Sequence, residues 1–136
     1  MKIKLEPNAI MPTRAHKTDA GLDLYSPYNQ DVPPKRSVVI DTGVHIELPK
    51  RTAGLLVPKS GLSTKYNLLS SGLIDEGYTG SIRVQLYNHS DQWYPVKKGD
   101  KISQLVIFPI YTPNLEVVDT LEATERGDKG FGSSGR

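Results

Sequence analysis

The strongest indication of the fold is the stretch Ile82-Arg83-Val84-Gln85-Leu86-Tyr87. Its three aliphatic side chains alternate with arginine, glutamine and tyrosine, which is the period-2 pattern of a half-buried β-strand. Apolar runs at 38–40 and 44–48 predict further strands, and the longer run at 102–110 predicts a strand covered on both faces. Residues 60–66 favour one short helix, while ten prolines and twelve glycines disfavour long ones. The sequence therefore predicts an all-β sandwich or barrel of short strands.

The composition indicates one domain with balanced charge. We divide its 136 residues into a β core of about 1–119 and a C-terminal arm of about 120–136. A formal charge of +2 argues against a nucleic-acid-binding surface, and the lack of cysteine excludes disulfides and thiolate chemistry. No apolar stretch approaches the roughly 20 residues that span a bilayer, and the N-terminus lacks the apolar core of a signal peptide. We therefore expect a cytoplasmic protein without a membrane or nucleic-acid partner.

Two segments near strand ends carry charged or hydroxyl side chains. In 18–24, Asp19 and Asp23 flank a small-residue turn, and either could hold Mg²⁺ directly or through water; a structural turn is the alternative. In 58–63, a strand ends at proline and a short helix opens with Ser60 and Gly61. Hydroxyl and free N–H groups there suit a phosphate, to which the preceding lysine adds charge, although a simple N-cap would look the same.

Two further segments combine polar groups with an apolar wall. In 72–80, Asp75 follows Leu-Ile in a glycine-bounded turn, where a carboxylate could act as general base for a water; Tyr78 offers a ring face for a sugar. A surface hairpin tip with a packed tyrosine is the alternative. In 99–107, Gln104 is an amide inside an apolar run, so either a ligand phosphate or the backbone must satisfy it.

The C-terminal residues 126–136, Arg-Gly-Asp-Lys-Gly-Phe-Gly-Ser-Ser-Gly-Arg, join four glycines, two serines and two arginines to one aromatic ring. Glycine lets backbone N–H groups approach an anion, serine and arginine add donors, and the ring can stack on a base. Such a tail could close over a nucleotide. Its composition also suits a disordered terminus.

In this order, the segments resemble the five signature motifs of the homotrimeric dUTP pyrophosphatases (dUTPases). Residues 19–24, 58–63, 72–80, 99–107 and 126–135 are similar to motifs one to five, and the resemblance covers nearly the whole chain. It implies a jelly-roll-like β fold, a homotrimer and active sites shared between subunits. Motifs one, two and four would come from one subunit, motif three from a second and the arm from a third.

The resemblance also implies the reaction, dUTP + H₂O giving dUMP and pyrophosphate, with Mg²⁺ as cofactor. Asp75 would be the catalytic residue that activates the water attacking the α-phosphorus, and Asp23 would hold Mg²⁺ through water. The groups implied to bind substrate are those around uracil and deoxyribose and those around the phosphates: Gly72, Leu73, Ile74, Tyr78, Lys59, Ser60, Gly61, Gln104, Arg126, Phe131, Gly132, Ser133 and Ser134.

The chain departs from the family pattern at three places, and two rival functions remain open. Lys59 stands where the second motif usually has arginine, Gly77 stands where an acid often precedes the tyrosine, and segment 65–72 is slightly short. A dCTP deaminase shares the fold but needs a glutamate beside the cytosine amine, and Glu76 is expected to point away from Asp75. A regulatory protein that uses nucleotide occupancy as a switch is the second rival, and it could coexist with catalysis through a protein partner.

Overall fold

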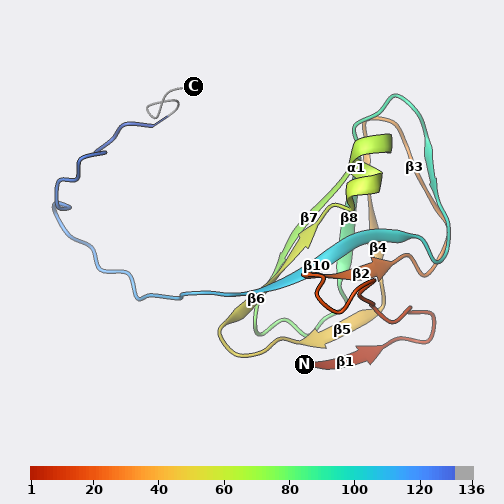
Figure 1. Ribbon diagram of the computed structural model, residues 1–136, viewed down its shortest axis with the longest axis horizontal. Coiled ribbons are helices and arrows are strands. Elements are labelled where there is room, and N and C mark those ends of the chain that lie inside the picture. Colours follow the sequence, from red (N-terminus) through yellow and green to blue (C-terminus); the bar gives the residue numbers. More distant parts are fainter. Residues whose placement is uncertain (131–136) are drawn as a thin grey trace.

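The alternating stretch forms a strand in the computed structural model, which describes residues 1–130 (Figure 1). The chain builds ten strands and one helix within those residues: β1 (Lys2–Leu5), β2 (Gly21–Tyr25), β3 (Gln30–Val32), β4 (Ser37–Asp41), β5 (Val44–Glu47), β6 (Thr52–Val57), α1 (Ser60–Tyr66), β7 (Leu68–Ile74), β8 (Arg83–Asn88), β9 (Tyr94–Val96) and β10 (Lys101–Pro109). The predicted all-β fold with one short helix is confirmed.

Antiparallel pairing organises these strands into one large and two small sheets. The six-stranded sheet has the order β2-β10-β6-β7-β8-β4, and β1-β5 and β3-β9 form two-stranded sheets. Alternation places one face of each strand in a common core, as in β8, where Val84 and Leu86 are buried while Tyr87 is exposed. The fully buried aliphatic side chains come from all three sheets, for example Leu24, Val32, Ile40, Val44, Leu68, Val84, Val96 and Leu105.

Helix α1 begins and ends where the sequence predicts it. Extended Lys59 occupies the N-cap position without a side-chain cap, and Asn67 ends the helix in the left-handed conformation with φ 53°. The simple N-cap interpretation of Ser60 is therefore wrong, because the residue lies inside the first turn and its carbonyl accepts hydrogen bonds from the hydroxyls of Ser63 and Thr64. No residue of the helix is buried, so it stays at the surface beside β7.

Strand β10 is covered on both faces over part of its length, so the prediction for 102–110 is wrong for the second half. Ile102, Ser103 and Leu105 are buried, whereas residues 106–108 are half-buried. The reason is that β2, which flanks one side of β10, pairs no further than Val106 with Gly21. Beyond that point β6 alone accompanies β10.

After β10 the chain leaves the strands, as the blue segment in Figure 1 shows. Residues 111–130 are exposed and form neither helix nor strand. The division at about residue 119 stays a prediction, although the last strand already ends at Pro109. Within residues 1–130, no helix is long and apolar enough to cross a membrane.

Candidate active site

Three of the sequence segments meet at one end of the large sheet. In strand β10, Gln104 lies opposite Asp23 of β2 on one side and Val57 of β6 on the other. Its amide Nε2 donates a hydrogen bond to the carbonyl of Pro58 over 3.2 Å, so a backbone carbonyl satisfies this nitrogen. The pairing therefore brings segments 18–24, 58–63 and 99–107 together, although they are far apart in sequence.

Asp23 is the electrostatic centre of this cluster. Its side chain is buried, and its two carboxylate oxygens accept hydrogen bonds from Lys59 Nζ at 2.5 Å and Lys101 Nζ at 2.7 Å. Burial alone would raise the pKa of Asp23, but the two lysines outweigh burial and hold the pKa below its ordinary value of 3.8. The same contact raises the pKa of Lys101. Asp19 also acts electrostatically on Asp23 and Lys101, so two carboxylates stand near two ammonium groups in this cluster. The Asp19 carboxylate accepts a hydrogen bond from the His16 amide at 2.9 Å.

Lys101 is a member of this cluster that sequence reasoning missed. The signal was its place at the entrance of β10, directly after the turn Lys98-Gly99-Asp100. The register between β2 and β10 shifts between Lys101 and Ser103, and such a bulge re-aims the side chains beside it. The shift cannot be read from the sequence, because it depends on pairing with β2.

The donor set at Asp23 fits a magnesium ion held mainly by a substrate. Mg²⁺ prefers oxygen ligands, and in phosphate-transfer sites it takes one or two carboxylates together with substrate phosphates. Among residues 1–130, no group of three His, Cys, Asp or Glu side chains could hold a metal ion. A complete protein cage is therefore not offered by the described part of the chain. The Asp23 carboxylate would contact the ion, directly or through water, alongside or in place of the two ammonium groups that its oxygens already bond.

The segment after β7 forms a second feature, a hairpin loop that bounds a cavity. The cavity measures about 180 Å³, and its lining includes every residue predicted in this segment for base, sugar and catalysis: Gly72, Leu73, Ile74, Asp75 and Tyr78. Leu56, Ile82 and Arg83, which were not predicted, complete the lining. A Cβ on Gly72 would come within 3.0 Å of Leu56 Cδ1, so glycine keeps this wall open. The loop is braced by two hydrogen bonds of Tyr78, from its amide to the Asp75 carbonyl at 3.0 Å and from its hydroxyl to the Ser81 carbonyl at 2.9 Å.

Glu76 points away from this cavity, as expected. Its Oε2 accepts a hydrogen bond from the backbone amide of Arg51 at 2.9 Å. Arg51 has a positive φ of 59°, so this contact fixes a strained turn before β6. A glutamate committed to the backbone of another turn is not placed to act on a ligand in the Asp75 cavity.

The two features lie at opposite ends of β6. Asp75 follows Ile74, which pairs with Gly54 near the start of β6, whereas Lys59 follows the end of that strand. Asp75 is thus about level with Ala53, and about six positions of extended chain, or roughly 20 Å, separate it from Lys59. One chain by itself does not place the Asp75 cavity beside the Asp23 cluster.

The predicted arm residues fall partly within the described chain. Arg126 is exposed, and its Nε donates a hydrogen bond to the carbonyl of Lys129 at 3.1 Å. Phe131, Gly132, Ser133 and Ser134 lie outside the described residues, so their predicted roles stay predictions.

Comparison with known proteins identifies the family. The dUTPase family profile matches residues 7–135. A deoxyuridine 5'-triphosphate nucleotidohydrolase of Clostridioides difficile is 45% identical over 135 residues, covering 97% of this chain and 94% of the relative. The structure of Staphylococcus bacteriophage 80alpha dUTPase with dUPNHPP has a TM-score of 0.93 and 38% identity, covering 99% of this chain and 98% of the other. A dUTPase variant from phage phi11 of S. aureus, described as revealing the coordination of a structural Mg(II) ion, has a TM-score of 0.83 and 33% identity over 90% and 98% of the two chains. This chain is a member of the dUTPase family.

Proposed function

We propose that this chain hydrolyses dUTP to dUMP and pyrophosphate in the cytoplasm, thereby limiting uracil in DNA and supplying dUMP for thymidylate synthesis. The observation that carries the proposal is the cavity beside Asp75, which joins the end of β7, a tyrosine ring and a carboxylate. The lining residues 72–74 of β7 pair with β6, whereas the pairing of β7 with β8 ends at Ser71. The cavity volume of about 180 Å³ suits a nucleoside fragment rather than a whole nucleotide. The family and the named relatives support the same substrate.

The last residues of β7 would recognise the nucleoside. Backbone groups around Gly72, Leu73 and Ile74 would pair with uracil, and mismatched donors and acceptors would reject cytosine. A site built to hydrogen-bond one partner can discriminate by roughly 10⁴-fold or more. Tyr78 would lie against the deoxyribose, where its fixed ring leaves no room for a 2′-hydroxyl.

Hydrolysis would use Asp75 as general base. Its carboxylate takes a proton from a water whose oxygen attacks the α-phosphorus, and the bond to the bridging oxygen breaks as pyrophosphate leaves. A side chain in this role typically contributes about 10²–10⁴-fold to the rate. Most of the remaining acceleration comes from holding the triphosphate in line with that water.

The triphosphate would be held by the cluster around Asp23, where segments 18–24, 58–63 and 99–107 meet. Lys59, Ser60, Gly61 and Gln104 are the proposed donors, with Lys101 as an added positive charge. Mg²⁺ bound to the triphosphate would neutralise its charge, with Asp23 contacting the ion through water. Because Lys59 now bonds Asp23, its contact with phosphate requires the ammonium to exchange one anionic partner for another. The arm, through Arg126, Phe131 and residues 132–134, would close over the bound nucleotide.

The proposed homotrimer with shared sites is supported by the separation of the two features. Roughly 20 Å divides Asp75 from Lys59 in one chain, so a second copy would supply the missing half. One face of the large sheet supports such contact, because strand pairing places five exposed apolar side chains on it: Val39, Leu55, Leu69, Leu73 and Tyr87. Monomers rarely leave such a patch uncovered.

The test is pyrophosphate release from dUTP, dCTP, dTTP and UTP, each with Mg²⁺ and then with EDTA. Selective cleavage of dUTP that stops in EDTA is the expected result. Ammonia released from dCTP would instead assign the deaminase reaction. If no nucleotide is turned over but dUTP still binds, the regulatory role becomes the favoured function. The protein partner of that role stays a prediction.

A further inference from the structure

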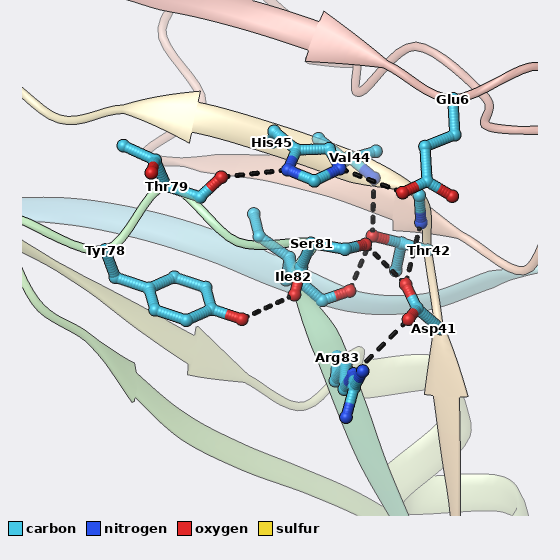
Figure 2. A network of polar contacts seen from close by, with 11 residues as sticks. Glu6, Asp41, Thr42, Val44, His45, Tyr78, Thr79, Ser81, Ile82 and Arg83 are labelled. Carbon is cyan, nitrogen blue, oxygen red and sulfur yellow. Dashed lines mark hydrogen bonds and ion pairs between the residues drawn. The ribbon is translucent and has the colours of Figure 1, made fainter.

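The hairpin loop that carries Asp75 and Tyr78 is held from outside by two polar anchors (Figure 2). On one side, Ser81 Oγ donates a short hydrogen bond to Asp41 of β4, which also pairs with Arg83 Nε at 3.3 Å. On the other side, His45 of β5 contacts the carbonyl of Thr79, the residue directly after Tyr78, through Nδ1 at 2.8 Å. The first anchor ends on a carboxylate, whereas the second depends on a histidine.

His45 is clamped between two acceptors. Its other ring nitrogen, Nε2, lies 3.0 Å from Oε1 of Glu6, and Figure 2 shows the ring between Thr79 and Glu6. A carbonyl oxygen and an ionised carboxylate both accept hydrogen bonds, so the two nitrogens must both donate. The imidazolium form alone does this. Either neutral tautomer turns one nitrogen lone pair toward an acceptor oxygen and loses that contact.

We propose that His45 is a positioning residue for the proposed reaction. Protonated His45, paired with Glu6, holds the Thr79 carbonyl and thereby fixes the position of the hairpin that carries Asp75 and Tyr78. The inference rests on the proposed function for its catalytic consequence. Its structural consequence, an ordered hairpin, is independent of the substrate. The side chain of His45 is 19% exposed, which places the contact at the edge of the core rather than in open solvent.

The surroundings of His45 favour the protonated state. The hydrogen bond to Glu6, followed by that to the Thr79 carbonyl, raises the pKa of His45 above its usual 6.5. Lys4, opposite His45 in the β1–β5 pair, lowers the pKa but does not reverse this shift. The remaining charges nearby, Lys2 and Glu47, pair with each other at 3.0 Å. The contact is therefore complete below about pH 6.5 and is lost as pH rises through the raised pKa.

Two substitutions separate the two halves of the contact. In His45→Asn the amide nitrogen takes the place of Nδ1, so it can still donate to Thr79 but no longer titrates. In His45→Gln the amide takes the place of Nε2, so it reaches Glu6 and leaves Thr79 unpaired. His89→Asn is the matched control, since the His89 ring stacks on Tyr87 on β8 and not on the hairpin.

The experiment measures kcat and KM for dUTP from about pH 6 to about pH 9, together with amide hydrogen exchange at Tyr78. We expect His45→Gln to lose roughly ten-fold in kcat/KM at neutral pH, because small displacements of reacting groups are costly. Its Tyr78 amide, which bonds Asp75, should exchange faster. Wild-type activity should decline at high pH as His45 loses its proton. His45→Asn should keep most of the activity and should not show this decline. Glu6→Gln should move the decline to lower pH.

The outcomes distinguish this inference from the proposed function. If the wild-type chain fails to cleave dUTP, the proposed function is wrong, and Tyr78 exchange still decides whether His45 orders the hairpin. If the wild type cleaves dUTP and His45→Gln matches it in rate, pH profile and exchange, the inference is overturned. NMR titration of His45 in the wild type is independent of any variant's folding, and a pKa at or below the ordinary value of 6.5 would also overturn the inference.

Discussion

Replacing Asp23 with asparagine tests the charge arrangement at the end of β2. The buried carboxylate accepts hydrogen bonds from Lys59 at 2.5 Å and Lys101 at 2.7 Å, one on each oxygen. An asparagine keeps the size of the side chain but offers one acceptor oxygen. Its NH₂ group would face the second ammonium, so one contact becomes a conflict between two donors.

The cost follows from the strength and exposure of these contacts. A hydrogen bond to a charged group contributes about 1.5–3 kcal/mol. The Lys59 side chain is 24% exposed and that of Lys101 is 42% exposed, so water partly compensates, more so for Lys101. We therefore expect Asp23→Asn to lower the free energy of unfolding by about 2–3 kcal/mol. For a chain of this size, that corresponds to a decrease in Tm of about 6–10 °C.

Thermal and urea unfolding without nucleotide, at a fixed chain concentration, measure this effect. Because the pKa of Asp23 is lowered, its contribution is present at neutral pH and is lost as pH falls below 3.8 and through the folded-state pKa. The gap between wild type and variant should therefore shrink in acid. Asp31→Asn, at an exposed position of β3, is the control and should change stability by less than about 0.5 kcal/mol. A variant as stable as the control, or a gap that persists in acid, would show that the Asp23 carboxylate does not stabilise the fold through the two lysines.

Three further predictions concern the reaction. Asp75→Asn should bind dUTP with near-normal affinity in calorimetry yet hydrolyse it at least about 100-fold more slowly; wild-type turnover would remove Asp75 from its role. Deleting residues 126–136 should reduce kcat/KM while size-exclusion chromatography shows unchanged assembly, and a monomeric but fully active chain would make the arm a structural clasp. Glu76→Gln should keep dUTP turnover close to wild type, because glutamine can still accept from the Arg51 amide. Loss of dUTP turnover in that variant would contradict the placement of Glu76 outside the Asp75 cavity.

Local patterns in the sequence predicted much of the fold. The alternation at 82–87 gave strand β8, and the segment after Pro58 gave helix α1 with the observed limits. The pairing of strands that are distant in sequence could not be predicted, because it depends on the register between them. The buried and half-buried halves of β10 differ because β2 pairs no further than Val106, and nothing in the run 102–110 marks that point.

The site was predictable to the extent that its residues sit in contiguous segments. The cavity lining includes Gly72, Leu73, Ile74, Asp75 and Tyr78, all from one segment. Partners from other segments were not visible. Lys101 reaches Asp23 through a register shift, and His45 reaches Thr79 from a different sheet. Such contacts are set by tertiary packing, which leaves no local signature.

Each active site is proposed to be completed by another copy of the chain. Mixing two inactive variants tests this proposal: Asp75→Asn, which damages the cavity end, and the double variant Ser60→Ala with Gln104→Leu, which damages the phosphate end. After the two are unfolded and refolded together in equal amounts, random trimers should regain about one quarter of the wild-type sites, because an intact half from each variant meets in that fraction. Recovery of dUTP hydrolysis at this level is the predicted result. A mixture no more active than its separate parents would place the whole site within one chain and contradict the account.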